Sequence, residues 1–271
     1  MARAEVARAL TIAGSDSGGG AGIQADLKTF GALGVFGMSA ITAITVQNTK
    51  GVAGYDEVSA ETVGAQIRAV VTDIGVDAAK TGMLASAVIV DSVADAVRET
   101  GIDTLVVDPV FVSKHGHPLL HEDAVSGLRE RIVPLAAVVT PNLPEAAGLA
   151  GFDVRTRQDM KRAAEAIVGL GARSVLVKGG HLEEEARASD LFFDGDCMEW
   201  LEAERIDTPH THGTGCVLSA AITAHLARGV EPLEAVSRGK EFVTEAIRGA
   251  LALGRGIGSV NPLHDFWSRP L

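Results

Sequence analysis

The residues whose types and spacing most clearly suggest chemistry form the run Thr208-Pro-His-Thr-His-Gly-Thr-Gly-Cys216, which leads directly into small and apolar residues at 217–228. Proline and glycine break regular structure and the following residues favour a helix, so Gly213–Cys216 is predicted to be a turn at a helix N-terminus. The first turn of a helix has unpaired backbone N–H groups and the positive end of the helix dipole. This turn is therefore predicted to bind an anion such as a phosphate.

Cys216 lies within the predicted turn, where the helix dipole and a neighbouring cation would lower the pKa of its thiol from about 8.5 toward neutrality. A thiol with such a pKa could act as a base. The alternative is a small buried packing residue, because most free cysteines are of that kind. The local sequence leaves both interpretations open.

Polar residues also follow three short apolar runs that are predicted to be strands. Asp108 follows the run 104–107, Glu145 follows the run 137–140, and Lys178 ends the run 174–177. Two acids at neighbouring strand ends suit Mg²⁺, a hard cation that keeps most of its water. Lys178 would suit phosphate oxygens, although most lysines are merely solvated.

Asn142 and Glu145 have a second interpretation. Asn142 could cap a short apolar helix while Glu145 bonds back to it, as in a capping box. The spacing of the two residues fits this arrangement as well as it fits a metal site, so both remain open.

Two further side chains could contact a bound ring. Asp26 borders the apolar face of a predicted helix at 20–34, and a carboxylate near the core needs a hydrogen-bond partner. That partner could be backbone, an arginine, or an amino group on a bound heterocycle. Gln47, after the second predicted strand, could offer a donor and an acceptor to the same ring.

Other cofactor chemistries fit less well. Gly20, Gly22 and Ala25 match the dinucleotide pattern G-x-G-x-x-A, but the residues after the next strand, 45–48, lack the acid that would hold a ribose. No P-loop motif occurs. Zinc would need a complete tetrahedral set, and neither a C-x-x-C nor an H-E-x-x-H spacing accompanies His210 and His212.

The composition limits the class of protein further. The chain has 271 residues, 46% of them hydrophobic, which is enough for one large domain. A net charge of −11 and an aromatic content of 4% argue against a nucleic-acid partner. No apolar run is long enough for a membrane span. With two cysteines and no signal segment before the first strand, we expect a cytoplasmic protein.

Predicted strands and helices alternate along the chain. The alternation favours a single three-layer α/β/α domain over residues 1–271, with a mostly parallel central sheet and ligands at the carboxyl ends of its strands. The runs 191–193 and 199–206, separated by Asp194-Gly-Asp196, predict an antiparallel hairpin at one edge. The other predicted strands are 9–13, 38–46, 77–81, 104–107, 137–140 and 174–177, and the other predicted helices are 20–34, 62–73, 86–99, 122–132, 156–170 and 232–251.

The motifs together resemble one family. The segments that carry the resemblance are Ala9–Asp16, Gly19–Phe30, Gln47–Thr49, Lys80–Leu84, Asp108–Val110, Thr140–Glu145, Lys178–His181 and His212–Cys216. In this order and over nearly the whole chain they are similar to the hydroxymethylpyrimidine/phosphomethylpyrimidine kinases of thiamine biosynthesis, in the ribokinase-like superfamily.

The resemblance implies an enzyme that uses ATP and Mg²⁺ to phosphorylate 4-amino-5-hydroxymethyl-2-methylpyrimidine and then its monophosphate. It also implies a homodimer. The implied pyrimidine pocket consists of Gly14, Asp26, Gln47, Met83 and Val110. The implied catalytic residues are Gly213, Thr214 and Gly215 of the anion hole, Cys216 in the place of a base, and Lys178. Asn142, Lys178, Gly179 and Gly213 would contact the nucleotide, and Asp108 and Glu145 would manage Mg²⁺.

The sequence departs from the family pattern at Phe111, where methionine is usual, and at Lys114-His-Gly-His117, where small or acidic residues are common. These departures put the substrate range in question. A pyridoxal kinase of the same fold is one alternative function, because its substrate is also a flat ring with a hydroxymethyl group. A catalytically silent ligand-binding protein is another, but such a protein would have no need of the complete set of acids, lysine and anion-binding turn.

Overall fold

The computed structural model describes residues 6–111, 122–180, 182 and 187–267. Its centre is a nine-stranded sheet with the order β3-β2-β1-β4-β5-β6-β7-β8-β9. The strands are β1 (Arg8–Ser15), β2 (Phe36–Asn48), β3 (Gly51–Glu57), β4 (Ala78–Thr81), β5 (Leu105–Val107), β6 (Val138–Val139), β7 (Val175–Lys178), β8 (Arg187–Phe193) and β9 (Met198–Glu204).

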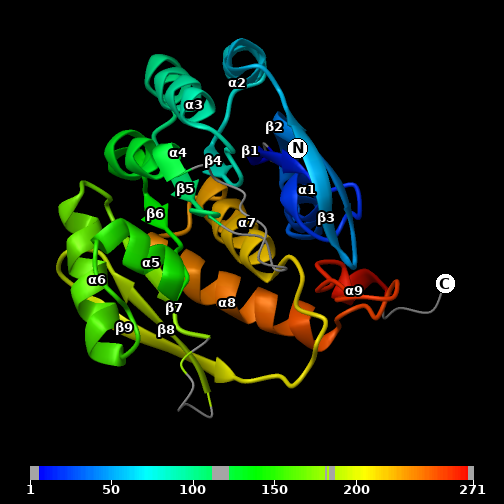
Figure 1. Ribbon diagram of the computed structural model, residues 1–271, viewed down its shortest axis with the longest axis vertical. Helices are drawn as coiled ribbons and strands as arrows, with labels where there is room; N and C mark the ends of the chain where they lie inside the picture. Colours follow the sequence, from blue (N-terminus) through cyan, green and yellow to red (C-terminus); the bar gives the residue numbers. More distant parts are fainter. Residues whose placement is uncertain (1–5, 112–121, 181, 183–186, 268–271) are drawn as a thin grey trace, which may run out of the picture.

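Helices cover both faces of this sheet, which confirms the predicted three-layer α/β/α architecture (Figure 1). The helices are α1 (Gly22–Ala32), α2 (Ala60–Asp73), α3 (Ala87–Thr100), α4 (Glu122–Gly127), α5 (Leu143–Ala150), α6 (Arg157–Gly169), α7 (Thr214–Ala227), α8 (Pro232–Arg248) and α9 (His264–Trp267), with a π-helical turn η1 (Leu128–Ile132) and a 3-10 turn η2 (Val133–Leu135).

Side chains alternate between the two layers along the short central strands. Ala78 and Val106 pack with α7 and α8, whereas Ala79 and Val107 pack with the layer that contains α2 to α6. Because both faces are covered, β4, β5 and β6 are buried along their whole length. This explains why β5 and β6 read as continuous apolar runs in the sequence, whereas β4 contains Lys80 and Thr81.

Helix α7 is deeply buried and follows the predicted anion-binding turn. Every residue from Val217 to Leu226 is buried, since α7 lies between the sheet, α1 and α8 (Figure 1). A helix that is apolar on all sides has no preferred solvent face. Burial on all sides fixes its N-terminus, and so fixes the turn before it.

The structure also corrects the predicted sheet. The β8–β9 hairpin is antiparallel as predicted, but β3 pairs antiparallel with β2 and forms a second antiparallel edge that the sequence did not predict. The predicted helix 217–228 begins at Thr214 instead. None of the helices within the described residues is long and apolar enough to span a bilayer.

Candidate active site

The predicted anion-binding turn lies at the N-terminus of α7, beside a cavity of about 1540 Å³ that runs along the carboxyl ends of the strands. Gly213 is the residue before the helix and has a φ of 83°. A Cβ there would lie 1.9 Å from the carbonyl oxygen of Gly20, so only glycine fits at this position. Thr214 donates its hydroxyl to the carbonyl of Thr211 at 2.8 Å, which closes the turn.

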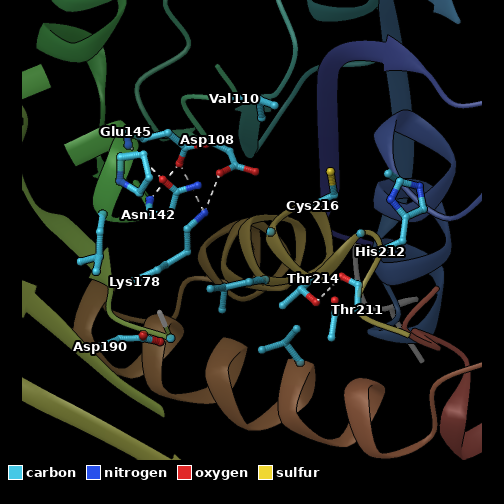
Figure 2. A pocket seen from close by; sticks show the side chains of 18 of the residues that line it. Asp108, Val110, Asn142, Glu145, Lys178, Asp190, Thr211, His212, Thr214 and Cys216 are labelled. Atoms are coloured by element: carbon cyan, nitrogen blue, oxygen red, sulfur yellow. Dashed lines mark hydrogen bonds and ion pairs between the residues drawn. The ribbon is translucent and has the colours of Figure 1, made fainter. Parts of the chain in front are cut away.

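Charged groups from three strand ends meet opposite this turn. Lys178, at the end of β7, places Nζ 3.0 Å from Asp108 Oδ1 and 3.9 Å from Glu145 Oε2 (Figure 2). Asp108 follows β5 and also accepts hydrogen bonds from Thr140 and Ser219. A Cβ at Gly215 would lie 3.5 Å from both Asp108 Oδ2 and Lys178 Nζ, so these charges face the helix N-terminus directly.

The capping interpretation of Asn142 and Glu145 is confirmed. Asn142 accepts the Glu145 N–H at 2.9 Å, and Glu145 Oε2 accepts the Asn142 N–H at 2.8 Å, at the start of α5. The same Glu145 oxygen is the one near Lys178. The cap therefore fixes Glu145 in the cavity wall beside Lys178.

Burial and charge act differently on the two acids. Burial raises the pKa of Glu145 from 4.5 to about 7, with Lys178 lowering it and the charge of Asp108 raising it. Burial also disfavours the Asp108 carboxylate, but Lys178 and Lys80 together hold the pKa of Asp108 below its usual range. Near neutral pH, Asp108 is ionised whereas Glu145 is close to half protonated.

The expectation of an acidic Cys216 thiol is wrong for this arrangement. Cys216 lines the cavity, but burial raises the pKa of its thiol to about 12. The charge of Lys80 and the Gly22 N–H lower this pKa, whereas the charges of Asp26 and Asp108 raise it further. The helix dipole does not outweigh this burial. A thiol in this environment is protonated at neutral pH.

Four of the five residues expected around a pyrimidine line the other end of the cavity: Gly14, Gln47, Met83 and Val110. Gly14 and Met83 are in close contact, since a Cβ at Gly14 would lie 3.2 Å from the Met83 sulfur. Val110, two residues after Asp108, lies near that carboxylate in the cavity lining (Figure 2). Phe111, one of the departures from the family pattern, also lines the cavity.

Asp26 does not belong to this set. Its side chain is fully buried, with Oδ2 accepting from Thr11 at 2.6 Å and Oδ1 accepting from Lys80 Nζ at 3.1 Å. Burial lowers the pKa of Lys80, but the negative charges around it, that of Asp26 foremost, together with the hydrogen bond to Asp26 outweigh burial and raise the pKa, so the ammonium stays ionised. Asp26 therefore acts on the cavity through Lys80, which lines it.

Lys80 has no role predicted from the sequence. The sequence feature that could have indicated its role is a lysine inside an otherwise apolar strand, because a buried charge needs a partner of opposite charge, here a carboxylate. Only the tertiary structure, in which α1 packs on β1 beside β4, shows that this carboxylate is Asp26.

Gly179 also lies outside the cavity wall. It is buried and its N–H donates to Asp190 Oδ1 at 2.9 Å, while Gly180 lines the cavity instead. Asp190 is paired with Lys240 of α8 at 2.7 Å, and Lys240 also donates to the carbonyl of Ala188. This buried pair, which the sequence did not predict, holds the backbone immediately after Lys178.

Among the described residues no group of three or more His, Cys, Asp or Glu side chains is arranged to hold a metal. His210 and His212 bond elsewhere, to the Gly258 N–H and to Asp16, so the zinc alternative finds no support here. The acidic donors near Lys178 are the carboxylates Asp108 and Glu145. Such a pair fits Mg²⁺ whose other ligands come from phosphate oxygens and water. Residues 114–117, which depart from the family pattern, lie outside the described residues.

Comparisons with known proteins agree with the sequence motifs. The model of the phosphomethylpyrimidine kinase family matches residues 16–261. The hydroxymethylpyrimidine/phosphomethylpyrimidine kinase of Rhizobium meliloti is 54% identical over 262 residues, which cover 96% of this chain and 98% of that protein.

Two solved structures are also similar. An ADP complex of Bacillus subtilis pyridoxal kinase has a TM-score of 0.90 at 44% identity and covers 96% of this chain and 98% of its own. The phosphomethylpyrimidine kinase of Clostridium difficile has a TM-score of 0.80 at 44% identity, with coverages of 90% and 100%. Similarity of the backbone thus extends to proteins named for two different ring substrates.

Proposed function

Because the chain belongs to the phosphomethylpyrimidine kinase family, we propose that it transfers the γ-phosphoryl group of ATP to 4-amino-5-hydroxymethyl-2-methylpyrimidine and then to the monophosphate. The observation that carries this proposal is one continuous cavity. It has an amide and an apolar wall at one end, and an anion-binding helix N-terminus facing Lys178 at its middle. Phosphoryl transfer needs positioning and charge stabilisation more than covalent chemistry, and this cavity supplies both.

Each group has a role that follows from its place. The N–H groups of residues 213–216 bind the developing charge on the transferring phosphoryl group. Lys178 neutralises the same oxygens, and its ion pair with Asp108 keeps its ammonium pointed at them. Asn142, at the start of α5, contributes to the nucleotide phosphate site from the opposite wall.

Cys216 belongs to the anion-binding turn and lines the cavity. Since its thiol is protonated at neutral pH, it does not act as a preformed thiolate. We propose that the thiol orients the hydroxymethyl group. As the oxygen of that group bonds to the γ-phosphorus and the bond to ADP breaks, the sulfur takes the alcohol proton and passes its own S–H proton to an oxygen of the transferring phosphoryl group. A monophosphate acceptor is already ionised and needs less of this assistance.

Asp108 and Glu145 would hold Mg²⁺ through its phosphate-bound form, since two carboxylates alone make an incomplete site. When bound, this ion neutralises charge on the phosphate oxygens. Glu145 can contribute a negative charge only after it loses its proton, which links nucleotide binding to pH near 7.

Pyridoxal kinase activity is the second candidate, because the Bacillus subtilis pyridoxal kinase is as similar in sequence as the Clostridium difficile phosphomethylpyrimidine kinase. A single assay separates the candidates: ADP release from Mg-ATP with hydroxymethylpyrimidine, its monophosphate or pyridoxal, with the products identified by mass. We expect turnover of both pyrimidines and little turnover of pyridoxal. Turnover of pyridoxal alone would reverse the assignment, and turnover of none would favour a silent ligand-binding protein.

We also propose that the protein is a cytoplasmic homodimer of single-domain protomers. The net charge of −11 supports solubility, and the family resemblance supports the dimer. Light scattering coupled to size-exclusion chromatography would give twice the chain mass of 28.0 kDa for a dimer, whereas a monomer mass would refute it.

A further inference from the structure

Lys80 is a buried cation in the cavity wall that the mechanism above does not use. Its side chain has no exposed surface, and Nζ donates to Asp26 Oδ1 at 3.1 Å. Lys80 and Gly82 both line the cavity, and a Cβ at Gly82 would lie 3.6 Å from Lys80 Nζ. A positive charge therefore lies directly behind the cavity surface.

The direction of the Lys80 side chain follows from its place in β4. Ala78 packs with the layer that contains α7 and α8. Lys80 is two residues further on, so its side chain leaves the same face of the strand. Helix α7 packs on β4 and begins at the carboxyl ends of the strands. Lys80 therefore faces the start of α7, where Cys216 lies.

Cys216 belongs to the same part of the interior. It packs against the cluster that contains Ala78 of β4 and Ala25 of α1, the residue before Asp26. Figure 2 shows the Cys216 side chain at the start of α7. The Asp26–Lys80 ion pair and the Cys216 sulfur are thus held by the packing of the same three elements, α1, β4 and α7.

The ion pair acts on the sulfur as a net positive charge. Burial raises the pKa of the Cys216 thiol to about 12, and among the neighbouring charges Lys80 has the largest effect, which lowers this pKa. Asp26 raises it, but by less than Lys80 lowers it. The difference fits the structure, because Asp26 also bonds to Thr11 of β1 through Oδ2.

Lys80 also has hydrogens to spare. An ammonium group carries three N–H donors, and within the described part of the chain Asp26 is the one acceptor bonded to Lys80 Nζ. A charge that is fully buried with unused donors is costly unless negative charge lies nearby. After Asp26, the negative groups that most favour the Lys80 ammonium are Cys216 and Asp108.

We propose that Lys80, held in place by Asp26, stabilises the negative charge that gathers on the Cys216 sulfur while phosphate is transferred to the hydroxymethyl group. The proposal rests on the function proposed above. It makes Lys80 a positioning residue that acts on the reaction through Cys216.

The need for such a charge follows from the proton transfers. The alcohol oxygen gives its proton to the sulfur as it bonds to the γ-phosphorus, and the sulfur gives its own proton to a phosphoryl oxygen. Negative charge on the sulfur rises whenever the second transfer runs ahead of the first. A fixed cation beside the sulfur lowers the energy of that charge without any rearrangement. Lys178, paired with Asp108, is left to neutralise the phosphoryl oxygens.

The reaction rate of the Cys216 thiol tests this role without any substrate. Alkylation requires the thiolate, so at a fixed pH its rate reports how well the site stabilises negative charge on sulfur. The chain has two cysteines, so the Cys197→Ala background leaves Cys216 as the one thiol. In this background we expect Lys80→Met to slow alkylation by iodoacetamide about fivefold at about pH 9.

A second variant separates this charge effect from stability. Asp26→Leu/Lys80→Met removes the whole ion pair, so it should regain stability but still react slowly with iodoacetamide. Partial unfolding cannot imitate this result, because an exposed thiol would react faster. Lys161→Met is the matched control: it removes a lysine from α6, in the other helical layer, and should leave the rate unchanged.

The kinetics give the second readout. In Asp26→Leu/Lys80→Met we expect kcat on hydroxymethylpyrimidine to fall about tenfold, with a smaller fall on the monophosphate, which has no alcohol proton to lose. Unchanged or faster alkylation in both Lys80 variants, or equal falls in kcat on the two acceptors, would overturn the proposal. If the wild-type protein turns over neither pyrimidine, the proposed function fails instead. The alkylation rates still show whether Lys80 acts on the sulfur, so the two failures are distinguishable.

Discussion

Lys178 Nζ lies 3.0 Å from Asp108 Oδ1, and the two residues come from the ends of β7 and β5, which are separated by β6 in the sheet. The pair spans the width of one strand directly in front of the α7 N-terminus. A cation is thus held where phosphate charge would lie, and its counter-charge is already in place. The consequences of this arrangement for Glu145, Cys216 and the buried pairs can be measured.

Glu145 should make stability depend on pH. The folded protein holds the Glu145 proton up to about pH 7, whereas an unfolded glutamate loses it near 4.5. Between these pH values the folded state therefore binds more protons than the unfolded state. The contribution of Glu145 to the free energy of unfolding falls as the pH rises through this window. A pKa shift of this size corresponds to a change of about 3 kcal/mol in the free energy of unfolding.

Glu145→Gln can keep the capping hydrogen bond but has no proton to lose. Its free energy of unfolding relative to wild type should rise by about 1 to 3 kcal/mol between pH 5 and pH 8, as measured by urea unfolding at each pH. Glu165→Gln, at an exposed position on α6, is the control and should show no such trend. A pH-independent difference for Glu145→Gln would mean that this carboxyl ionises normally.

Cys216→Ala should separate the two phosphorylation steps. If the thiol exchanges a proton with the alcohol, kcat on hydroxymethylpyrimidine should fall about 100-fold, within the range for general acid–base groups, with a much smaller loss on the monophosphate. The pH dependence between about 6 and 8 should keep its shape, because the thiol pKa is about 12. Cys197→Ala, at an exposed cysteine, should change neither rate. Equal loss on both acceptors would remove the proton-exchange role.

Asp26→Asn should act mainly on folding. It would leave the Lys80 ammonium buried without its counter-ion, and breaking one partner of a buried pair costs about 3 kcal/mol or more. The double variant Asp26→Leu/Lys80→Met should recover much of this loss in urea unfolding. A large rise in KM for the pyrimidine with unchanged stability would instead restore Asp26 as a direct substrate ligand.

The Asp190–Lys240 pair should couple stability to phosphoryl transfer. Asp190→Asn would unpair a lysine whose side chain is 8% exposed and loosen the N–H bond to Gly179, so we expect a stability loss of about 3 kcal/mol. We also expect a lower kcat with little change in pyrimidine KM, because Lys178 adjoins this backbone. Glu202→Gln breaks the exposed Arg187–Glu202 pair that also involves β8 and should have little effect on either quantity. A loss of stability without any change in kcat would make the Asp190–Lys240 pair purely structural.

The sequence by itself indicated the order of the elements except β3, and it indicated the charged residues and the turn at the centre of the cavity. Apolar runs ended by polar residues mark parallel strands whose ligand groups follow them, so Asp108, Glu145 and Lys178 could be placed at one sheet edge from this pattern alone. The glycines before α7 likewise indicated an anion-binding turn, because no other residue allows a close approach there. These features are local in the chain, and local patterns are what a sequence displays.

Only the tertiary structure decided which polar groups face the cavity and which face each other. Asp26 looks like a candidate ligand in the sequence, yet it pairs in the core with Lys80, 54 residues away, because α1 packs on β1, the strand next to β4. The pKa of Cys216 was predicted in the wrong direction because a helix dipole can be read from the sequence, whereas the extent of burial cannot. Gln47 contacts His212, which lies 165 residues away in the chain. Burial and long-range pairing are properties of the packed chain, and they set the charges and hydrogen positions on which the chemistry depends.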